Sequence, residues 1–344
     1  MADSERFDAV MRVLVVSLLA AILGFGGFFG YTVYRDRRAT EDANPALRTI
    51  KESKEKVTRA PNDASARIRL GEAYAAANKS QQAIEQFNAA LKINPKHSGA
   101  YLDLGLLAMA SERPNEGKAY LKEVVDLIAD KDPMAEGSDR LEIAYFNLGK
   151  IEMDQHNYEV AVGYFKQALR IRSDASDTYL YVASCLDAMG QPDEAKRNLD
   201  IALRFDPNFS EARYLLAKLL LAEGDKVRAA EELGKSLRLS PSAPEPQELS
   251  GRFGDTADYA KKALALAKTD PDAAIDAASI AFNLAPLDNL ASGKLQARLL
   301  LKQGRKKTAL SVYRSIAEVF PNDREVEAAI TRLSKTKAGT ATKN

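Results

Sequence analysis

The chain has very little of the side-chain chemistry on which most metal and cofactor sites depend. Its 344 residues include one cysteine (Cys185), two histidines (His97 and His156) and no tryptophan. A single cysteine excludes an intramolecular disulfide and a cysteine-based metal cluster. Two histidines leave little material for a histidine-rich metal site or a histidine-driven triad. We therefore expect neither a bound metal nor a cofactor.

An excess of charge of one sign is also lacking. Lysine and arginine total 49 and aspartate and glutamate total 48, which gives a formal net charge of +1. Proteins that bind nucleic acid usually carry a basic patch or a strongly basic balance. The short basic runs here are typical of membrane flanks or solvated tails, and no nucleic-acid partner is expected.

The motifs of common enzyme classes are missing as well. The sequence contains no GxxxxGK[ST] phosphate loop and no HExxH, CxxC or GxSxG motif. His97 and His156 fall in predicted turns and are interpreted as exposed turn residues. Cys185 falls in a predicted helix, where a small buried apolar residue is the default interpretation. We expect no catalytic residues and no enzymatic activity.

One long apolar run is present, near the N-terminus. After a short tail at residues 1–12, the 22 residues from Val13 to Tyr34 carry no charge. As a helix they would span roughly 33 Å, enough for a hydrocarbon core of about 30 Å. A secretory signal has a shorter apolar run followed by small residues, whereas here Arg35 and further charges follow. The run predicts an uncleaved single transmembrane helix over residues 13–34.

The flanks of this run do not settle its orientation. Two basic residues precede it (Arg6 and Arg12), and four follow within about 15 residues (Arg35, Arg37, Arg38 and Arg48). Positive charge alone places the C-terminal side in the cytoplasm, although a long domain often crosses regardless of its flanks. Gly26 and Gly30 form a GxxxG spacing that could pair two such helices into a homodimer. Glycine is also simply common in membrane helices.

The rest of the chain is repetitive. Prolines at positions 61 and 95, and again at 207 and 241, are separated by 34 residues. The interval between the two pairs, 112 residues, equals three periods plus ten residues, which predicts an insertion. Within the first repeat, Ala64 to His97, small residues stand at positions 8, 20 and 27 and a phenylalanine at position 24 (Gly71, Ala83, Ala90 and Phe87).

Each of these positions has a physical role. Small residues let two antiparallel helices approach closely, and the large apolar residues between them fill the remaining space. Proline at position 32 ends the second helix, because its ring cannot continue the helical hydrogen-bond ladder. The period and residue classes together resemble the tetratricopeptide repeat family. Seven repeats are counted, and they begin near Ala64, Ser98, Glu142, Ser176, Ser210, Asp255 and Leu290.

The resemblance implies an all-α fold, in which the predicted transmembrane helix precedes a right-handed α-solenoid of about seven helix pairs. Repeats 2 and 6 depart from the pattern, at Gly117 and at Lys261 and Lys262. The expected organisation is a charged helical spacer or cap (35–63), repeats 1–5 (64–243) with an insertion (132–141), a linker (244–254), repeats 6–7 (255–323), and a capping helix with a disordered tail (324–344).

The resemblance also implies a protein- or peptide-binding groove, lined by positions 2, 5, 9 and 12 of each first helix. These positions give Ile68, Glu72, Leu102, Leu106, Met109, Ile143, Phe146, Lys150, Met153, Leu180, Asp187, Tyr214, Lys218 and Leu221. Such a mixture of apolar side chains and lysines suits a helical or extended peptide with apolar anchors and some acidic charge. The alternative is that several of them bury against neighbouring repeats. The family's carboxylate clamp for chaperone tails is not expected, because Ile68, Glu72 and Asp103 replace its lysine and asparagines.

Two functions remain open. The first is a non-catalytic membrane-anchored scaffold with its repeats outside the cytoplasm, similar in architecture to assembly subunits of cytochrome c maturation and other envelope complexes. The second is a cytoplasm-facing membrane adaptor that regulates an enzyme or a secretion machine. The first is favoured by the resemblance, and the second by the count of flanking positive charges.

Overall fold

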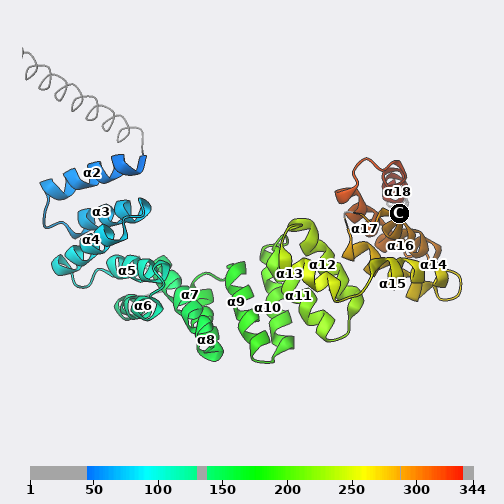
Figure 1. Cartoon of the computed structure of the whole chain (residues 1–344), viewed down its shortest axis with the longest axis horizontal. Coiled ribbons are helices and arrows are strands. Elements are labelled where there is room, and N and C mark those ends of the chain that lie inside the picture. The colour runs from blue at the N-terminus through cyan, green and yellow to red at the C-terminus, as the bar shows by residue number, and fades with distance from the viewer. Residues whose placement is uncertain (1–44, 130–137, 287, 336–344) are drawn as a thin grey trace, which may run out of the picture. The chain divides into compact units, whose positions relative to one another are not determined.

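The computed structural model describes residues 45–129, 138–286 and 288–335, and these are folded almost entirely into α-helices (Figure 1). The first half contains α2 (Pro45–Arg59), α3 (Ala64–Ala76), α4 (Ser80–Ile93), α5 (Ser98–Ala110), α6 (Pro114–Ile128), α7 (Ser138–Asp154), α8 (Tyr158–Ile171), α9 (Ser176–Ala188) and α10 (Pro192–Phe205). The second half contains α11 (Ser210–Ala222), α12 (Lys226–Leu239), α13 (Pro244–Gly251), α14 (Thr256–Leu266), α15 (Pro271–Leu284), α16 (Leu290–Lys302), α17 (Lys306–Val319) and α18 (Arg324–Lys335).

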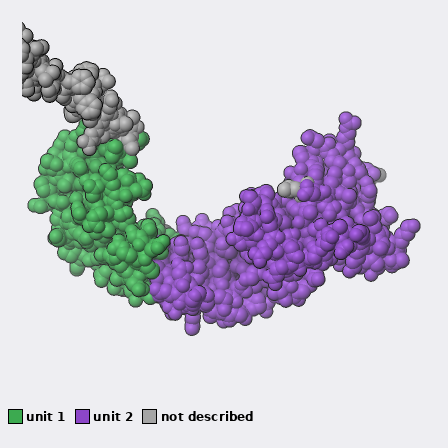
Figure 2. All heavy atoms as spheres, in the orientation of Figure 1, with its two compact units in different colours: residues 1–144 green, residues 145–344 purple. Residues whose placement is uncertain are grey.

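The chain divides into two compact units, residues 1–144 and residues 145–344, and the division falls inside α7 (Figure 2). Consecutive helices pair within each unit, for example α3 with α4 in the first and α11 with α12 in the second. The starts of five first helices match the predicted repeat starts (Ala64, Ser98, Ser176, Ser210 and Leu290), and α14 begins one residue after the predicted Asp255. The helix-pair architecture is therefore confirmed.

Size complementarity at two repeat positions explains why the pairs pack so closely. A Cβ added to Gly71 would lie 2.5 Å from the ring of Phe87, so only glycine fits at position 8 when position 24 is phenylalanine. Where alanine stands at position 8, as at Ala183, position 24 is the smaller Leu199, and both are fully buried. The close approach of the two helices thus depends on the summed volume of two facing side chains.

Each regular first helix ends in the same way. The residue at position 15 has a positive φ in six repeats: Asn78, Glu112, His156, Gly190, Gly224 and Gly304. The N–H of the next residue then donates to a carbonyl five residues earlier, as from Lys79 to Tyr74 at 2.9 Å. This arrangement satisfies carbonyls that the helix end would otherwise leave unpaired, and it turns the chain toward the second helix.

Another contact joins successive repeats. The side chain at position 4 of a first helix donates to the carbonyl six residues earlier, just before that helix. Arg67 bonds to Pro61 at 3.0 Å and Arg213 to Pro207 at 3.1 Å. The same contact is made from Tyr179, Gln247 and Tyr259. Arginine, tyrosine and glutamine can all reach this carbonyl, so the contact recurs without a conserved residue type along the chain.

The predicted linker at residues 244–254 is wrong in its first eight residues, which form α13. Pro244 stands one period after Ser210, and Gln247 makes the position-4 contact to Pro241, so α13 is a shortened first helix in register. Proline is tolerated in the first helical turn, where its missing N–H has no partner to lose. Leu249 and Phe253 are only 3% and 5% exposed, and Gly254 then turns the chain at a φ of 98°.

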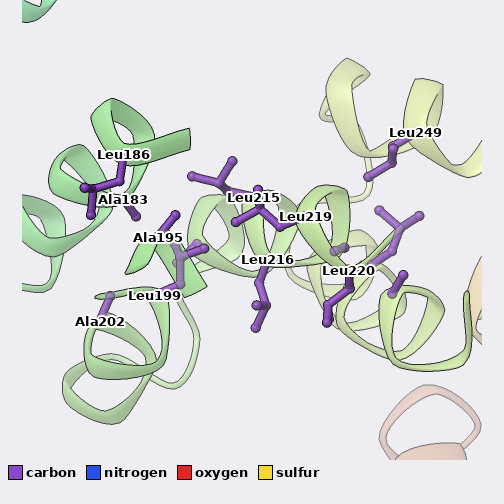
Figure 3. Close-up of a cluster of buried hydrophobic side chains, with 14 of the residues drawn as sticks. Ala183, Leu186, Ala195, Leu199, Ala202, Leu215, Leu216, Leu219, Leu220 and Leu249 are labelled. Atoms are coloured by element: carbon purple, nitrogen blue, oxygen red, sulfur yellow. The ribbon is translucent and has the colours of Figure 1, made fainter. Parts of the chain in front are cut away.

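The largest core of the second compact unit extends from repeat 3 to α15. It combines small and branched residues of α9 to α12 with Leu249, Ile280 and Leu284. Figure 3 shows Ala183, Ala195 and Leu199 at one end of this cluster and Leu220 and Leu249 at the other. Helix α15 is buried over ten of its fourteen residues, because α12, α14 and α16 all pack against it.

Single helices cover both ends of the described repeats. At the N-terminal end, α2 places Ile50 in the first core cluster beside Leu47 and Val57, so the predicted helix packs on repeat 1 instead of acting only as a spacer. At the C-terminal end, α18 buries Val326 and Ala329 against α17. The capping helix predicted within residues 324–344 is present as α18.

The insertion predicted at residues 132–141 is shorter than expected. Helix α7 already begins at Ser138, with Asp139 in its first turn, where an acidic side chain stabilises the positive end of the helix dipole. The remaining positions of that prediction lie outside the described residues. So do the predicted transmembrane helix at 13–34, the dimer face at Gly26 and Gly30, and the tail after residue 335. None of the helices that the structure describes is long and apolar enough to cross a membrane.

Candidate partner-binding face

The residues predicted to contact a partner lie on the first helices and differ widely in exposure. Ile68 and Leu102 are only 6% and 7% exposed, so they belong to the core, and their assignment as contact residues is wrong. Position 5 turns inward there because the side chain fills space between neighbouring helices. Glu72 and Leu106 are exposed. The other predicted contact residues are half-buried: Met109, Ile143, Phe146, Lys150, Met153, Leu180, Asp187, Tyr214, Lys218 and Leu221.

An aromatic cluster joins α7, α8 and α9 within the second compact unit. The rings of Phe146 and Tyr181 meet edge to face with centroids 5.4 Å apart. Phe165 stacks on Tyr181 at 5.5 Å. Such pairs stabilise by about 0.5–1.5 kcal/mol beyond the area that they bury. Tyr181 was not predicted from the sequence, because it stands at position 6; an aromatic residue next to a predicted contact position was the available signal.

A lysine lies over this cluster. The Nζ of Lys150 is 6.0 Å from the ring centre of Phe146 and 5.8 Å from that of Tyr181. Among the residues that the structure describes, Lys150 makes no ion pair. The electron-rich ring faces hold the ammonium group in place without neutralising it. Lys150 is therefore a positioned positive charge that can still donate a hydrogen bond to a carboxylate.

The next lysine along the same set of helices is already paired. Lys218 of α11 donates to Asp187 of α9 at 2.8 Å. Its side chain is 43% exposed, so this pair contributes little to stability. Of these two lysines, Lys150 is therefore the one whose ammonium group is not paired with a carboxylate of the described residues, and it lies between α7 and α9.

In the first compact unit the corresponding surface is acidic. Burial and, to a smaller extent, the nearby Glu72 carboxylate raise the pKa of the Asp103 carboxyl to about 7, although the Arg140 guanidinium opposes the shift. Near neutral pH this carboxyl is therefore protonated in a large fraction of molecules. It can donate as well as accept a hydrogen bond at that pH.

Repeat 7 carries basic residues at positions 5 and 9, Lys294 and Arg298, which were not among the predicted contact residues. Lys294 donates to Asp323 at 2.7 Å, and Arg298 contacts Glu325 through its Nε at 3.0 Å. These bonds hold the pKa of both carboxyls below their ordinary values. Because α18 begins one period after α16, the residue just before it (Asp323) and its first turn (Glu325) supply the acids that these basic residues bind.

The cysteine and the two histidines have packing or hydrogen-bonding roles. Burial raises the pKa of the Cys185 thiol to about 11, so it stays protonated at neutral pH. His97 is half-buried and not exposed as predicted, because its Nδ1 accepts the N–H of Ala100 and caps α5. His156 is the exposed turn residue that the sequence predicts, and its Nδ1 lies 2.8 Å from the Tyr158 hydroxyl. No cluster of metal-binding side chains occurs among the described residues.

Comparison with known families agrees with this geometry. Models of the tetratricopeptide repeat match residues 64–97, 152–219, 190–250 and 295–323. The chain therefore contains tetratricopeptide repeats, and it is an all-helical repeat protein of the kind that binds protein or peptide partners. The matched residues include α9 and α11 and the last part of α7.

Individual similar proteins are distant. The human Protein O-mannosyl-transferase TMTC3 is 24% identical over 271 residues, which cover 71% of this chain and 28% of that protein. The chain thus spans less than a third of this relative's length. Among solved structures, YrrB, a TPR protein with an unusual peptide-binding site, is similar with a TM-score of 0.48 and 18% identity over 57% of this chain and 96% of YrrB. The structure of pilF from Pseudomonas aeruginosa is similar with a TM-score of 0.44 and 16% identity, over 79% of this chain and 97% of that chain.

Proposed function

We propose that this protein is a non-catalytic scaffold that binds an extended or helical segment of a partner protein across α7, α9 and α11. The observation that carries the proposal is Lys150, which is held over Phe146 and Tyr181 and has no ion pair among the described residues. A partner segment would place an acidic side chain on Lys150 and apolar side chains against Met153, Leu180 and Tyr214, which are half-buried in this region.

The test is a selection of peptides from a random displayed library against the full chain. We expect enriched peptides to carry an acidic residue with apolar neighbours. Their affinity, measured by fluorescence polarisation, should fall about 5- to 30-fold in Lys150→Gln, because a hydrogen-bonded charge pair contributes about 1–2 kcal/mol. Lys166→Gln on α8 is the matched control, since that lysine is exposed. Equal losses in both variants, or basic peptides in the selection, would exclude this site.

The proposal includes a membrane anchor. The uncharged residues 13–34 would hold the repeats at a membrane, and Gly26 and Gly30 would allow two anchors to pair. We place the repeats outside the cytoplasm, by analogy of architecture with anchored repeat proteins of envelope complexes such as those of cytochrome c assembly. Sedimentation of the full chain with membranes after an alkaline carbonate wash tests the anchor, and replacing residues 13–34 by a polar linker should release the chain into the supernatant.

The second candidate, a cytoplasm-facing adaptor, is favoured by the four arginines that follow the apolar run. Reporter fusions at the C-terminus separate the two candidates. Activity of a fused alkaline phosphatase would support the extracytoplasmic placement, because this enzyme matures only outside the cytoplasm. Fluorescence of a reporter that folds only in the cytoplasm would support the adaptor.

A further inference from the structure

A cavity in the second compact unit lies away from the aromatic cluster, between the C-terminal turns of α12 and α17. Its volume is about 560 Å³. Three basic residues line it: Arg213, Lys235 and Arg238. Leu239, Val319 and Pro207 add apolar surface, and the Leu239 side chain is unusually exposed for its size, at 41%.

Two of the three basic residues already have acidic partners. Glu232 accepts from Arg213 and from Lys235, each at 2.5 Å, and only about 15% of the Arg213 and Glu232 side chains is exposed. Arg213 also makes the position-4 contact to Pro207. These two cations therefore form part of the wall, and their charge is largely compensated by Glu232.

Arg238 is different. Its Nη1 is buried and has no hydrogen-bond partner among the described residues. A buried donor without an acceptor costs about 1–3 kcal/mol, and more when it carries charge. Folded proteins rarely retain such a group unless a ligand or a water molecule fills the missing position. Arg238 also lines the cavity, so a small movement of its side chain would bring this donor to an acceptor oxygen bound there.

The charges around the cavity restrict which oxygen fits. Three cations face two carboxylates, those of Glu232 and Glu318, which leaves one net positive charge. The C-terminal turns of two helices add partial negative charge nearby. One net positive charge can balance a single carboxylate but not a doubly charged phosphate, and a carboxylate has the planar geometry that suits a guanidinium.

We propose that this cavity binds a carboxylate whose neighbouring group is apolar, with Arg238 as the anion-binding residue and Leu239 and Val319 as the apolar wall. The end of a peptide chain with an apolar last residue and a small organic acid share this chemistry. The site is independent of the partner-binding face, since none of its lining residues contributes to the Lys150 cluster.

The probes are N-acetyl-leucine, N-acetyl-Ala-Ala-Leu, N-acetyl-leucinamide and inorganic phosphate, each titrated into the full chain in detergent. Ligand-observed NMR reports the two acetylated compounds and the amide, and competition with N-acetyl-leucine reports phosphate. We expect both free carboxylates to bind and the amide to bind at least 5-fold more weakly. A tripeptide that binds at least 10-fold more tightly than N-acetyl-leucine identifies a chain end as the ligand, and similar affinities identify a small acid.

Arg238→Gln should weaken binding of the carboxylates at least 5-fold, while Arg228→Gln on the same helix, whose side chain is 65% exposed, should leave it unchanged. Lys235→Gln provides a second variant if Arg238→Gln does not fold, with a smaller expected loss of about 2- to 4-fold. Equal binding of the amide, unchanged binding in Arg238→Gln, or displacement by phosphate at lower concentration than the free carboxylates would each overturn the proposal. The proposal would also be overturned if none of the probes bound at a concentration 10-fold above the weakest binding that the method detects.

Discussion

At the scale of single residues, the packing of each pair is governed by the sum of two facing volumes. Gly71 faces Phe87, Gly149 faces Phe165, and Ala183 takes the same position opposite Leu199. A one-carbon addition on one side must therefore be matched by a reduction on the other. The repeat tolerates different side chains at these two positions as long as they fit one another, and Gly105 opposite Leu121 shows that a smaller sum also packs closely.

Gly71→Ala should lower the free energy of unfolding by about 1–3 kcal/mol, because the new methyl group overlaps the Phe87 ring and outweighs the better helix propensity of alanine. Phe87→Leu should also be destabilising, since it leaves a cavity. The double variant should recover at least 1 kcal/mol relative to the sum of the two losses, as the Ala183 and Leu199 pair suggests. Urea unfolding of the four proteins measures this coupling, and strict additivity would contradict the volume argument.

Asp103 gives the first compact unit a pH-dependent stability. Its pKa is raised from an ordinary value near 3.8 to about 7 in the folded chain, so the folded state binds the proton more tightly than the unfolded state. The free energy of unfolding therefore falls as pH rises from about 4 to about 7, and the loss is complete above that range. Asp103→Asn should remove this slope and be more stable than the unmodified chain at pH 8, by on the order of 2 kcal/mol.

The check is a series of urea unfolding curves between pH 4 and pH 8, with Asp126→Asn as control because Asp126 is exposed. The advantage of Asp103→Asn should shrink toward pH 4. An advantage that is constant with pH would show that Asp103 is charged throughout and that the Arg140 guanidinium dominates over burial.

At the scale of helices, packing against neighbouring helices explains the irregular elements α13 and α15 as well as the regular ones. Helix α13 is a first helix that stops after two turns. Helix α15 packs against α12, and a Cβ added to Gly234 of α12 would lie less than 3 Å from Asn283 of α15, so glycine is needed there. The composition of residues 244–254 suggests a loop, since proline and glycine are frequent there. Packing of Leu249 and Phe253 in the core decides instead for a helix.

Leu249→Ala tests whether α13 is part of the core. We expect a loss of about 2–4 kcal/mol in the free energy of unfolding, because a leucine that is 3% exposed leaves a cavity when truncated. Leu264→Ala on α14 is the control, since its side chain is 67% exposed, and it should cost less than about 0.5 kcal/mol. Similar small effects in both variants would restore the linker interpretation.

At the scale of the whole molecule, an array of repeats is stabilised by contacts between neighbours, so its ends need covers. Helix α2 covers repeat 1, and α18 covers repeat 7 with an apolar face that includes Val326. Glu325 in the first turn of the same helix pairs with both Lys294 and Arg298. Apolar burial and charge pairing therefore fix α18 in one position.

A chain that ends at Asp323 should melt at a lower temperature than a chain that ends at Lys335, which retains α18. We expect a difference of about 5–10 °C, because Tyr313 and Ile316 lose their cover and Arg298 loses Glu325. Circular dichroism during heating measures it, and light scattering should show earlier aggregation of the shorter chain. Coincident melting curves would mean that α18 is a dispensable tail.

The sequence by itself determined the repeat. The 34-residue period, the small residues at fixed positions and the helix-ending prolines are local features, and local backbone geometry is enough to specify pairs of helices and their starts. It also predicted which first-helix positions could face a partner, and Phe146, Lys150 and Tyr214 at those positions are half-buried.

Only the tertiary structure decided which of those side chains are available. Ile68 and Leu102 occupy a predicted contact position but are buried, because exposure depends on how closely the next helix approaches and not on the position alone. The same is true of the charges. Lys150 has no ion pair among the described residues, whereas Lys218 and Lys294 are paired, and the difference arises from residues of other helices, 29 and 31 positions away in the paired cases. Pairing across helices depends on distances between side chains that no single repeat contains.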